Sequence, residues 1–369
     1  MNKINVVSLF DGLGGARQAL KNLEIDCNYF ASEIDEYAIK ISKKNHSDIK
    51  HLGSVEKITI SKLKKLGVDT VDLLIGGSPC QDLSLCKANR QGLKGERSKL
   101  FYQYVRLLKE LKPKYFLLEN VSSMRKSDAQ IITDILCVEP IMINSALLTA
   151  QNRRRYYWTN IPNVKQPKDK KIFLKDILEK GFTDKDKSYC IDASYYKGGN
   201  LKSYFGKGRR QLVFNKPIQL AFIKKNQQGN RVYSVEGKSV SLKAEGGGGG
   251  AKTGLYTLPH ALTECRTEEA KEIRRKMKKK TGKDYCPRRG KTIQPRKDGK
   301  SNCLTTGITK EYYLNDGIEI RKLTPIECER LQGLPDNYTK GVSNTQRYKM
   351  IGNGFTIPVV SHILKNMEI

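Results

Sequence analysis

The stretch Val71–Ser84 constrains the fold more than any other part of the sequence. Val71-Asp72-Leu73-Leu74-Ile75 is an apolar run of strand length, ending at two glycines, which is typical of a parallel strand buried on both faces. Pro79 stops this strand, so Cys80 follows on the loop at its carboxyl end, where open α/β sheets bind ligands. A lone cysteine is more often a small buried hydrophobe, but the rigid proline before it favours an exposed thiol.

The charge of the chain indicates a polyanionic partner. The 369 residues suffice for two domains and carry a formal net charge of +30. Such an excess of positive charge attracts nucleic acid. A purely structural nucleic-acid-binding protein would be equally basic, so charge alone does not distinguish an enzyme from a binder.

The cysteines and histidines form no recognisable ligand set. The nine cysteines are scattered without a C-x-x-C pair, and the four histidines do not cluster. This pattern argues against a disulfide framework and against a metal site. No signal peptide and no apolar run of membrane-spanning length is present. We therefore expect a soluble, cytoplasmic protein with no metal and no membrane partner.

The N-terminal part alternates strands and helices. A strand is expected at Ile4–Leu9, then a glycine-rich turn at Phe10–Gly15, a helix at Ala16–Asn22 and a strand at Cys27–Ser32. Glu33 follows the second strand, where an acid accepts hydrogen bonds from ribose hydroxyls.

The glycine pattern differs from the dinucleotide fingerprint. Arg17 stands where the third glycine of that fingerprint belongs. No pyrophosphate therefore has to be bound, and a nicotinamide oxidoreductase is excluded. A nucleoside-type cofactor such as S-adenosylmethionine fits better.

The alternation continues to about residue 161 and predicts six or seven strands in one sheet. The expected elements are a strand at 51–55, helices at 57–66 and 98–111, a strand at 114–118, and further elements at 124–137, 141–148 and 155–159. The strand at 114–118 brings Glu119 to the same edge as Cys80. A carboxylate at the end of an apolar strand is costly to bury unless it has partners.

The middle of the chain, from about 161 to 315, loses this alternation. It contains a short apolar segment at Leu212–Phe214 and a helical pattern at Thr267–Lys280. The basic run in that helix is either a solvated face or a phosphate contact, and both interpretations stay open.

The C-terminal part is again compact. Thr324-Pro325-Ile326-Glu327 has the composition of a helix start, and Gly333 ends that helix. A turn is expected at Ile351–Phe355. The amphipathic helix Ile357–Leu364 has no sheet of its own nearby, so we expect it to pack on the first domain.

Several of these motifs together resemble the DNA cytosine-5 methyltransferases, in the order in which that family has them. The motifs are Phe10-Asp11-Gly12-Leu13-Gly14-Gly15, Gly77-Ser78-Pro79-Cys80-Gln81, Glu119-Asn120-Val121, Gln151-Asn152-Arg153-Arg154-Arg155, Leu323-Thr324-Pro325-Ile326-Glu327-Cys328-Glu329-Arg330-Leu331-Gln332-Gly333 and Gly352-Asn353-Gly354. Residues 71–161 are most similar to animal de novo methyltransferases, and the C-terminal part is similar to phage and bacterial enzymes.

The resemblance implies a fold and a division into domains. We expect an α/β, Rossmann-like, S-adenosylmethionine-dependent methyltransferase domain with a mainly parallel sheet, formed by residues 1–161 together with 316–369. A smaller, irregular, β-containing target-recognition domain would occupy 162–315.

The resemblance also implies catalytic roles. Cys80 would add as a thiolate to carbon 6 of a cytosine flipped out of duplex DNA. Glu119 would bind the exocyclic amine and ring nitrogen 3, and Arg153 and Arg155 would favour the thiolate while holding the base or its phosphate. Gln81 and Ser84 either contact the DNA backbone or cap the following helix.

A set of residues would bind S-adenosylmethionine and release S-adenosyl-L-homocysteine. In this assignment Phe10 faces the adenine, Glu33 the ribose and Asn353 the methionine end. The other candidates are Gly12, Leu13, Gly14, Gly15, Ile34, Ser54, Val55, Pro79 and Leu100. Two of these depart from the family pattern: Ser54 stands where an aspartate is usual, and Ile34 where many members have an aromatic. We expect weaker cofactor binding from both.

The resemblance leaves rival functions open. Some family members methylate transfer RNA, but a long basic recognition segment favours double-stranded DNA. A catalytically silent regulator would be expected to lack the Pro79-Cys80 pair or the glycines, and both are present. A cognate restriction endonuclease is a candidate partner, and we expect a monomer associated with the nucleoid through DNA.

Overall fold

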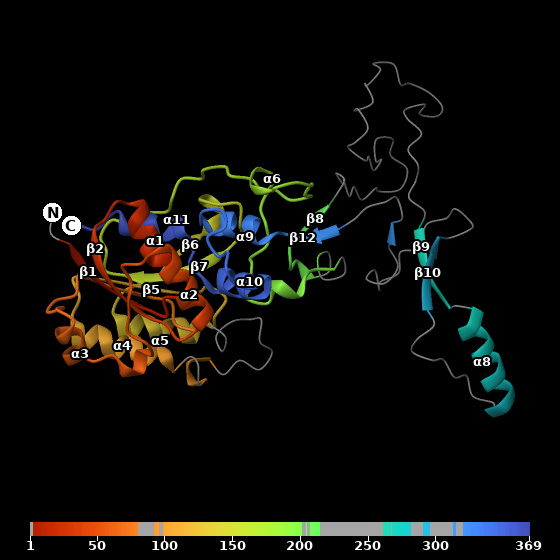
Figure 1. Cartoon of the computed structure of the whole chain (residues 1–369), viewed down its shortest axis with the longest axis horizontal. Helices are drawn as coiled ribbons and strands as arrows, with labels where there is room; N and C mark the ends of the chain where they lie inside the picture. The colour runs from red at the N-terminus through yellow and green to blue at the C-terminus, as the bar shows by residue number, and fades with distance from the viewer. Residues whose placement is uncertain are drawn as a thin grey trace, which may run out of the picture.

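The computed structural model describes residues 3–79, 92–95, 99–200, 204, 207–214, 261–266, 268–281, 291–295, 313–314 and 320–369. Cys80, Gln81 and Ser84 lie outside the described residues. Figure 1 shows a layered α/β body that contains both termini, which lie at the same end of it. None of the helices in the described ranges is long and apolar enough to span a membrane.

Strands and helices alternate through the first 159 residues. The strands are β1 Ile4–Leu9, β2 Cys27–Ser32, β3 Lys50–His51, β4 Leu73–Gly76, β5 Tyr115–Val121, β6 Ile141–Asn144 and β7 Arg154–Thr159. The α-helices between them are α1 Gly15–Asn22, α2 Glu36–Asn45, α3 Ile60–Lys65, α4 Leu100–Leu111 and α5 Lys126–Leu136. Short 3-10 turns are η1 Val55–Lys57, η2 Gly92–Lys94 and η3 Ser145–Leu147.

The later part contains shorter elements. They are α6 Leu174–Ile177, η4 Tyr195–Lys197, β8 Leu212–Phe214, β9 Ala261–Arg266, α8 Glu268–Thr281, β10 Lys291–Pro295, β11 Tyr313–Leu314 and β12 Ile320–Lys322. The chain then ends in three helices, α9 Pro325–Gln332, α10 Asn344–Asn353 and α11 Ile357–Leu364. The antiparallel strands β9, β10 and β11 form a small separate sheet.

The seven strands β1 to β7 form one sheet in the order β3-β2-β1-β4-β5-β7-β6. The pairings from β3 through β5 are parallel, and β7 is antiparallel to both of its neighbours. This confirms the expected Rossmann-like, mainly parallel sheet. The strand order reverses between β1 and β4, so the sheet has a topological switch point there.

Each face of the sheet is covered by helices, because its strands are apolar on both faces. On one face, Leu74 and Phe116 pack with Leu63 of α3, Phe101 of α4 and Ile132 of α5. On the other face, Val6 and Tyr29 belong to a cluster that includes α1, α2 and α11. Figure 1 shows α3, α4 and α5 side by side along one side of the sheet.

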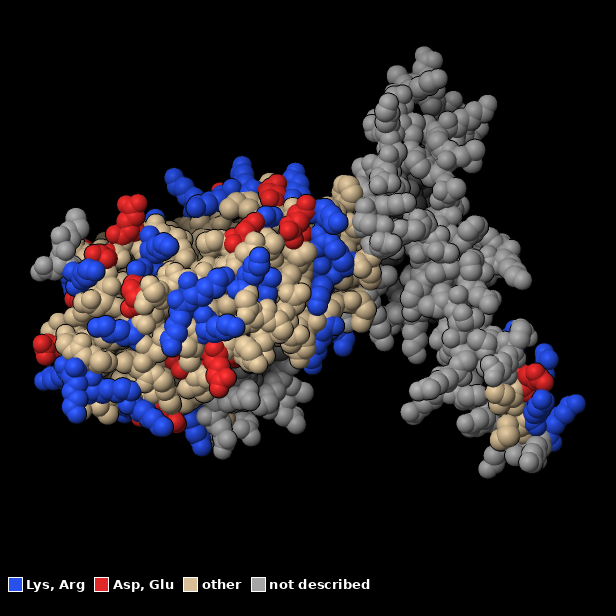
Figure 2. Space-filling view, in the orientation of Figure 1, with Lys and Arg blue, Asp and Glu red and all other residues tan. Residues whose placement is uncertain are grey.

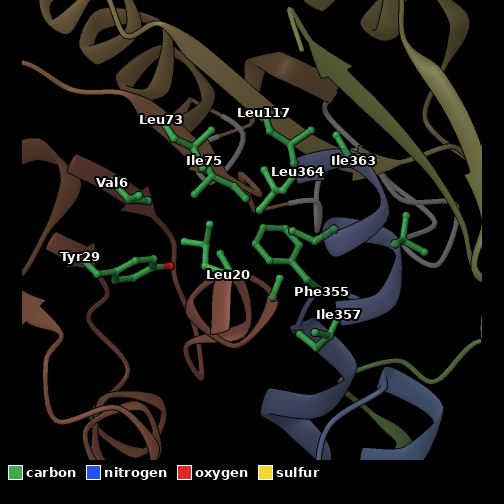
Figure 3. Packing of buried hydrophobic residues seen from close by; sticks show 14 of the residues in the cluster. Val6, Leu20, Tyr29, Leu73, Ile75, Leu117, Phe355, Ile357, Ile363 and Leu364 are labelled. Atoms are coloured by element: carbon green, nitrogen blue, oxygen red, sulfur yellow. The ribbon is translucent and has the colours of Figure 1, made fainter. Parts of the chain in front are cut away.

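The C-terminal helix completes the core of the first domain, as expected. Helix α11 has the predicted bounds, and Ile357, Ile363 and Leu364 belong to the same cluster as Ile75 of β4 and Leu117 of β5. Figure 3 shows these side chains converging from the C-terminal helix and the strands. Helix α9 also begins as predicted, with Thr324 and Glu327 forming a capping box.

A third cluster joins the segment after β7 to the C-terminal helices. It contains residues of α6, the 191–195 stretch, β8, α9 and α10, namely Ala150, Leu174, Ile177, Ile191, Tyr195, Val213, Leu323, Cys328, Leu331, Tyr348 and Ile351. Strands β8 and β12 pair antiparallel, with Phe214 opposite Ile320. Phe214 and Ile320, which flank the segment between these strands, are therefore neighbours in space.

Three expected elements differ in the structure. Strand β5 extends to Val121, because pairing with antiparallel β7 carries the ladder past the apolar run. Ile351–Asn353 ends helix α10 and is not a turn; Ser343 caps that helix and its residues Tyr348 and Ile351 are buried. The expected strand at 51–55 is reduced to β3, because Gly53 has a positive φ and Ser54 caps η1.

The packing of α11 can be tested at Ile363, which is fully buried. Ile363→Ala removes side-chain atoms and leaves a cavity in the core, so the free energy of unfolding should fall by about 2–5 kcal/mol. Urea denaturation measures this change. Lys365→Ala, at an exposed position directly after α11, should change stability by less than about 0.5 kcal/mol. Equal stabilities for the two variants would contradict the packing.

Candidate functional site

Three chain segments meet at the sheet edge next to the switch point. Leu9 of β1 is opposite Gly76 of β4, and Gly76 is opposite Leu118 of β5. The glycine-rich turn after β1, the segment after β4 and the end of β5 therefore share one edge of the sheet. This is the edge at which the sequence predicts the site.

The segment after β4 passes directly against Glu119. A Cβ atom on Gly77 would lie 3.2 Å from Glu119 Oε2 and 3.1 Å from Phe355 Cε1, so glycine allows this close approach. Ser78 follows and is held by Asn120, whose Nδ2 donates to Ser78 O at 3.3 Å and to Ser78 Oγ at 3.1 Å. Pro79 is half-buried after it. The chain leading to Cys80 is thus fixed beside the Glu119 carboxylate.

Glu119 and Arg155 form an ion pair at this edge. Arg155 Nε lies 2.8 Å from Glu119 Oε1, and both side chains are largely buried. Their contact follows from the ladder, because Glu119 is opposite Tyr157, two residues from Arg155, in antiparallel β7. Arg155 Nη1 also donates to Arg154 O at 2.8 Å. The arginine therefore orients the carboxylate, and two predicted site residues meet.

Arg153 lies elsewhere, in a buried cluster of backbone carbonyls. Its Nη1 donates to Ile191 O at 3.1 Å and to Gly352 O at 3.2 Å, and its Nη2 donates to Gly354 O at 2.9 Å. Arg153 as a whole is 3 % exposed. Arg153 thus ties the start of β7 to the end of α10, the segment that contains Asn353.

The glycine-rich turn is tightly packed. Phe10, Gly12 and Gly14 all have positive φ, and a Cβ on Gly15 would lie 3.1 Å from Ile357 of α11. Glu33 closes the turn: its Oε2 accepts from Gly12 N at 2.8 Å, and its Oε1 accepts from Ile34 N at 2.7 Å. The carboxylate expected to face a ribose therefore also joins the turn to the start of α2.

The other candidate cofactor residues surround this turn. Phe10 and Leu100 are half-buried against the cluster that contains Val55. Ile34 is 74 % exposed, which is unusual for an isoleucine and leaves its side chain free to cover an apolar ligand. Ser54 Oγ accepts from Glu56 N at 3.4 Å.

Asn353, the candidate for the methionine end, lies next to a residue that contacts the turn. Asn353 is exposed at the end of α10. A Cβ on the following residue, Gly354, would lie 3.6 Å from buried Leu13. The end of α10 therefore contacts the turn that contains Gly14 and Gly15.

Asp11 is a buried acid that sequence reasoning did not single out. Its Oδ1 accepts from Ser8 Oγ and from Tyr29 OH, each at 2.6 Å, and its Oδ2 is buried without a hydrogen-bond partner. Burial raises the pKa of the carboxyl to about 6, against the opposing effect of the two hydrogen bonds, and the Glu33 carboxylate raises it further. The sequence signal that could have identified Asp11 is an acidic residue between an apolar strand and Gly12.

Solved structures place this architecture among the methyltransferases. The chain is similar to a methyltransferase from Entamoeba histolytica, with a TM-score of 0.57, 16 % identity and coverage of 99 % of this chain and 98 % of that one. It is also similar to DNMT2 from Spodoptera frugiperda, with a TM-score of 0.56, 16 % identity and coverage of 99 % of both chains. At these identities the likeness shows the fold, which is that of a methyltransferase.

The sequence defines the family within this class. Residues 4–368 match the model of the C-5 cytosine-specific DNA methylases, and the chain belongs to that family of enzymes. It is 28 % identical to the orphan methyltransferase M.SPRI of Bacillus phage SPR, covering 100 % of this chain and 98 % of the phage protein. It is 26 % identical to the type II methyltransferase M.HhaI of Haemophilus parahaemolyticus, covering 99 % and 94 %. The predicted resemblance is confirmed.

The buried Asp11 carboxyl should make stability depend on pH. Its pKa is about 6 in the folded protein, against an ordinary value of 3.8. Between these values the folded state binds a proton that the unfolded state has lost, so the free energy of unfolding falls as pH rises from about 4 to about 6. Asp11→Asn should remove this dependence and be more stable than the original protein at pH 7.5, by at most ~3 kcal/mol.

Urea denaturation between pH 4 and 7.5 measures this effect. The advantage of Asp11→Asn should shrink as pH falls from 6 towards 4. Asp134→Asn, at an exposed position of α5, is the matched control and should show no such trend. A stability difference for Asp11→Asn that is constant with pH would contradict the raised pKa.

Proposed function

We propose that this protein transfers a methyl group from S-adenosyl-L-methionine to carbon 5 of a cytosine flipped out of duplex DNA, through a covalent adduct with Cys80. The observation that carries this proposal is the approach of the Gly77-Ser78 segment to the Glu119–Arg155 pair. Cys80 is only three residues along the chain from Gly77, which lies against a carboxylate that is already oriented by Arg155.

The covalent steps balance with S-adenosylmethionine as the methyl donor and water or hydroxide as the acceptor of one proton. The Cys80 thiolate adds to carbon 6 of the cytosine, and carbon 5 becomes nucleophilic. Glu119 binds the exocyclic amine and nitrogen 3, which limits the build-up of negative charge on the ring. After carbon 5 has gained the methyl group, a base such as water or hydroxide takes its proton, the C5–C6 double bond re-forms and the C6–S bond breaks, which returns the thiolate. A base stacked in a duplex cannot reach these groups, so it has to be flipped out.

The residues around the glycine-rich turn fit a nucleoside cofactor. Exposed Ile34 and half-buried Phe10 and Leu100 offer apolar contacts for an adenine, and Glu33 offers a carboxylate for ribose hydroxyls. S-adenosylmethionine, when bound, supplies an electrophilic methyl group on a sulfonium. Arg153 would act here by fixing the backbone of Gly352 and Gly354, and with it the orientation of Asn353.

Duplex DNA is the proposed substrate because of the charge of the chain. The net charge is +30, and Figure 2 shows lysines and arginines spread over the visible face of the described body. Positive charge of this kind binds the phosphate backbone irrespective of sequence. Relatives include both orphan and type II methyltransferases; a cognate endonuclease and a monomeric state stay predictions.

We propose a target-recognition unit that is narrower than the sequence suggests. The expected domain spans 162–315, but Leu174, Ile191 and Tyr195 share a core with α9 and α10. Paired strands β8 and β12 support boundaries close to Phe214 and Ile320. The separable recognition unit in this proposal is therefore 215–319.

The catalytic proposal can be tested with tritiated S-adenosylmethionine and mixed-sequence duplex DNA. Label should appear at cytosine carbon 5, and Cys80→Ala should abolish it because no other residue forms the adduct. Cys137→Ala, at an exposed cysteine of the described body, should keep the activity. A duplex containing 5-fluorocytosine should trap a covalent adduct, because fluorine replaces the proton that must leave.

Two results would contradict this proposal. Methyl transfer by Cys80→Ala would exclude Cys80 as the nucleophile. Label in transfer RNA but not in duplex DNA would make RNA the substrate.

The recognition boundary can be tested by deletion. Replacing 215–319 with a short glycine-containing turn should leave a folded body that binds S-adenosylhomocysteine but does not methylate DNA, since β8 and β12 are already neighbours. Removing 162–319 should prevent folding, because it removes core residues such as Leu174 and Ile191. Circular dichroism and calorimetry measure both properties. A folded 162–319 deletion would support the wider boundary.

A further inference from the structure

Asp128 is a buried acid that the proposed chemistry does not use. It lies in the first turn of α5 and is 7 % exposed. Its Oδ1 accepts a hydrogen bond from Leu93 N at 3.3 Å. Desolvating a carboxylate is costly. The contacts that Asp128 makes with the backbone of another segment account for its burial.

Gly92 fits closely against the same carboxylate. A Cβ atom on Gly92 would lie 2.6 Å from Asp128 Oδ1 and 2.9 Å from Oδ2, and the residue has a φ of +64°. A side chain at this position would therefore displace Asp128. Leu93 next to it is 4 % exposed and packs in the cluster that contains Val121 and Met124. The backbone of Gly92–Leu93 is thus held by a polar and an apolar contact.

The other end of the intervening segment is held by the same structural unit. Asn120, at the end of β5, is 1 % exposed and donates to both Ser78 O and Ser78 Oγ. Asn120 and Asp128 are joined by the short connection between β5 and α5. The chain is therefore hydrogen-bonded to the β5–α5 unit at two places. One is Ser78, shortly before Cys80, and the other is Leu93, next to Gly92.

We propose that Asp128 is a positioning residue for methyl transfer, because it anchors the far end of the segment that begins at Cys80. Fixing both ends of a chain segment reduces the conformations it samples, and an error of about 1 Å in the placement of a reacting group can lower a rate about 100-fold. Asp128 touches neither cofactor nor base in this proposal. The inference rests on the proposed function, because the proposed function makes Cys80, the first residue of this segment, the nucleophile.

Two variants disturb the anchor from opposite sides. Asp128→Ala removes the acceptor, and Gly92→Ala leaves the carboxylate in place but forces the two apart. Each has a matched control. Asp134→Ala alters an exposed acid of the same helix, and Gly67→Ala has a similar positive φ of +80° with open space around its Cβ position.

The experiment measures covalent trapping on a mixed-sequence duplex with 5-fluorocytosine, together with S-adenosylhomocysteine binding by calorimetry. Asp128→Ala and Gly92→Ala should slow trapping at least about 10-fold, with the cofactor dissociation constant changed less than about twofold. Asp128→Asn keeps an acceptor for Leu93 N and should recover most of the lost rate. The two controls should trap at the original rate.

Each outcome is decisive. Trapping within twofold of the original rate in a folded Asp128→Ala or Gly92→Ala variant overturns the inference, and if one of them fails to fold the other decides. A loss of cofactor binding in parallel with trapping would show a general structural role and also overturns it. If the original protein forms no covalent adduct with the 5-fluorocytosine duplex, the proposed function itself is contradicted.

Discussion

The pairing of β1 with β4 is the constraint on which the rest of this structure depends. A Cβ on Gly76 would lie 2.9 Å from Leu9 O, so the two strands approach this closely because Gly76 has no side chain. The chain continues from β1 into α1, which belongs to one helical layer, whereas α4 after β4 belongs to the other. The two connections therefore diverge at the switch point, and polar groups can gather between them at the sheet edge.

Buried carboxylates tie the later segments of the chain to one another. Glu329 accepts from Asn337 N at 2.7 Å and from Arg347 Nη2 at 2.8 Å. Glu327 accepts from Arg321 Nη1 at 2.8 Å and from Glu179 N at 2.9 Å, which links α9 to the preceding strand β12 and to a distant stretch of chain. A buried charge is tolerated only where its hydrogen bonds are made. Through these hydrogen bonds the two carboxylates join α9 to α10, to β12 and to the stretch that contains Glu179.

The elements that the sequence predicts well are those with local signals. Strands β1 and β2 and helix α11 have the expected bounds, and the capping box of α9 is present. The end of β5 and helix α10 were not predicted, because the first depends on pairing with β7 and the second on burial against the 191–195 stretch. Glu119 and Arg155 meet as an ion pair at the sheet edge that their motifs share, and the catalytic roles expected of them stay predictions. Asp11, Asp128 and the carbonyl cluster around Arg153 depend on contacts between distant segments, which no local pattern shows.

The neighbouring strands β8 and β12 have a consequence for how such a protein can diversify. Hydrogen-bonded antiparallel strands lie about 5 Å apart, so the entry and exit points of the intervening segment are nearly coincident in space. A segment attached in this way can be lengthened, shortened or exchanged as one contiguous cassette without moving the ends that hold it. The two strands would keep their pairing through such an exchange, so the edge of the sheet that carries Glu119 and Arg155 would not have to change with it.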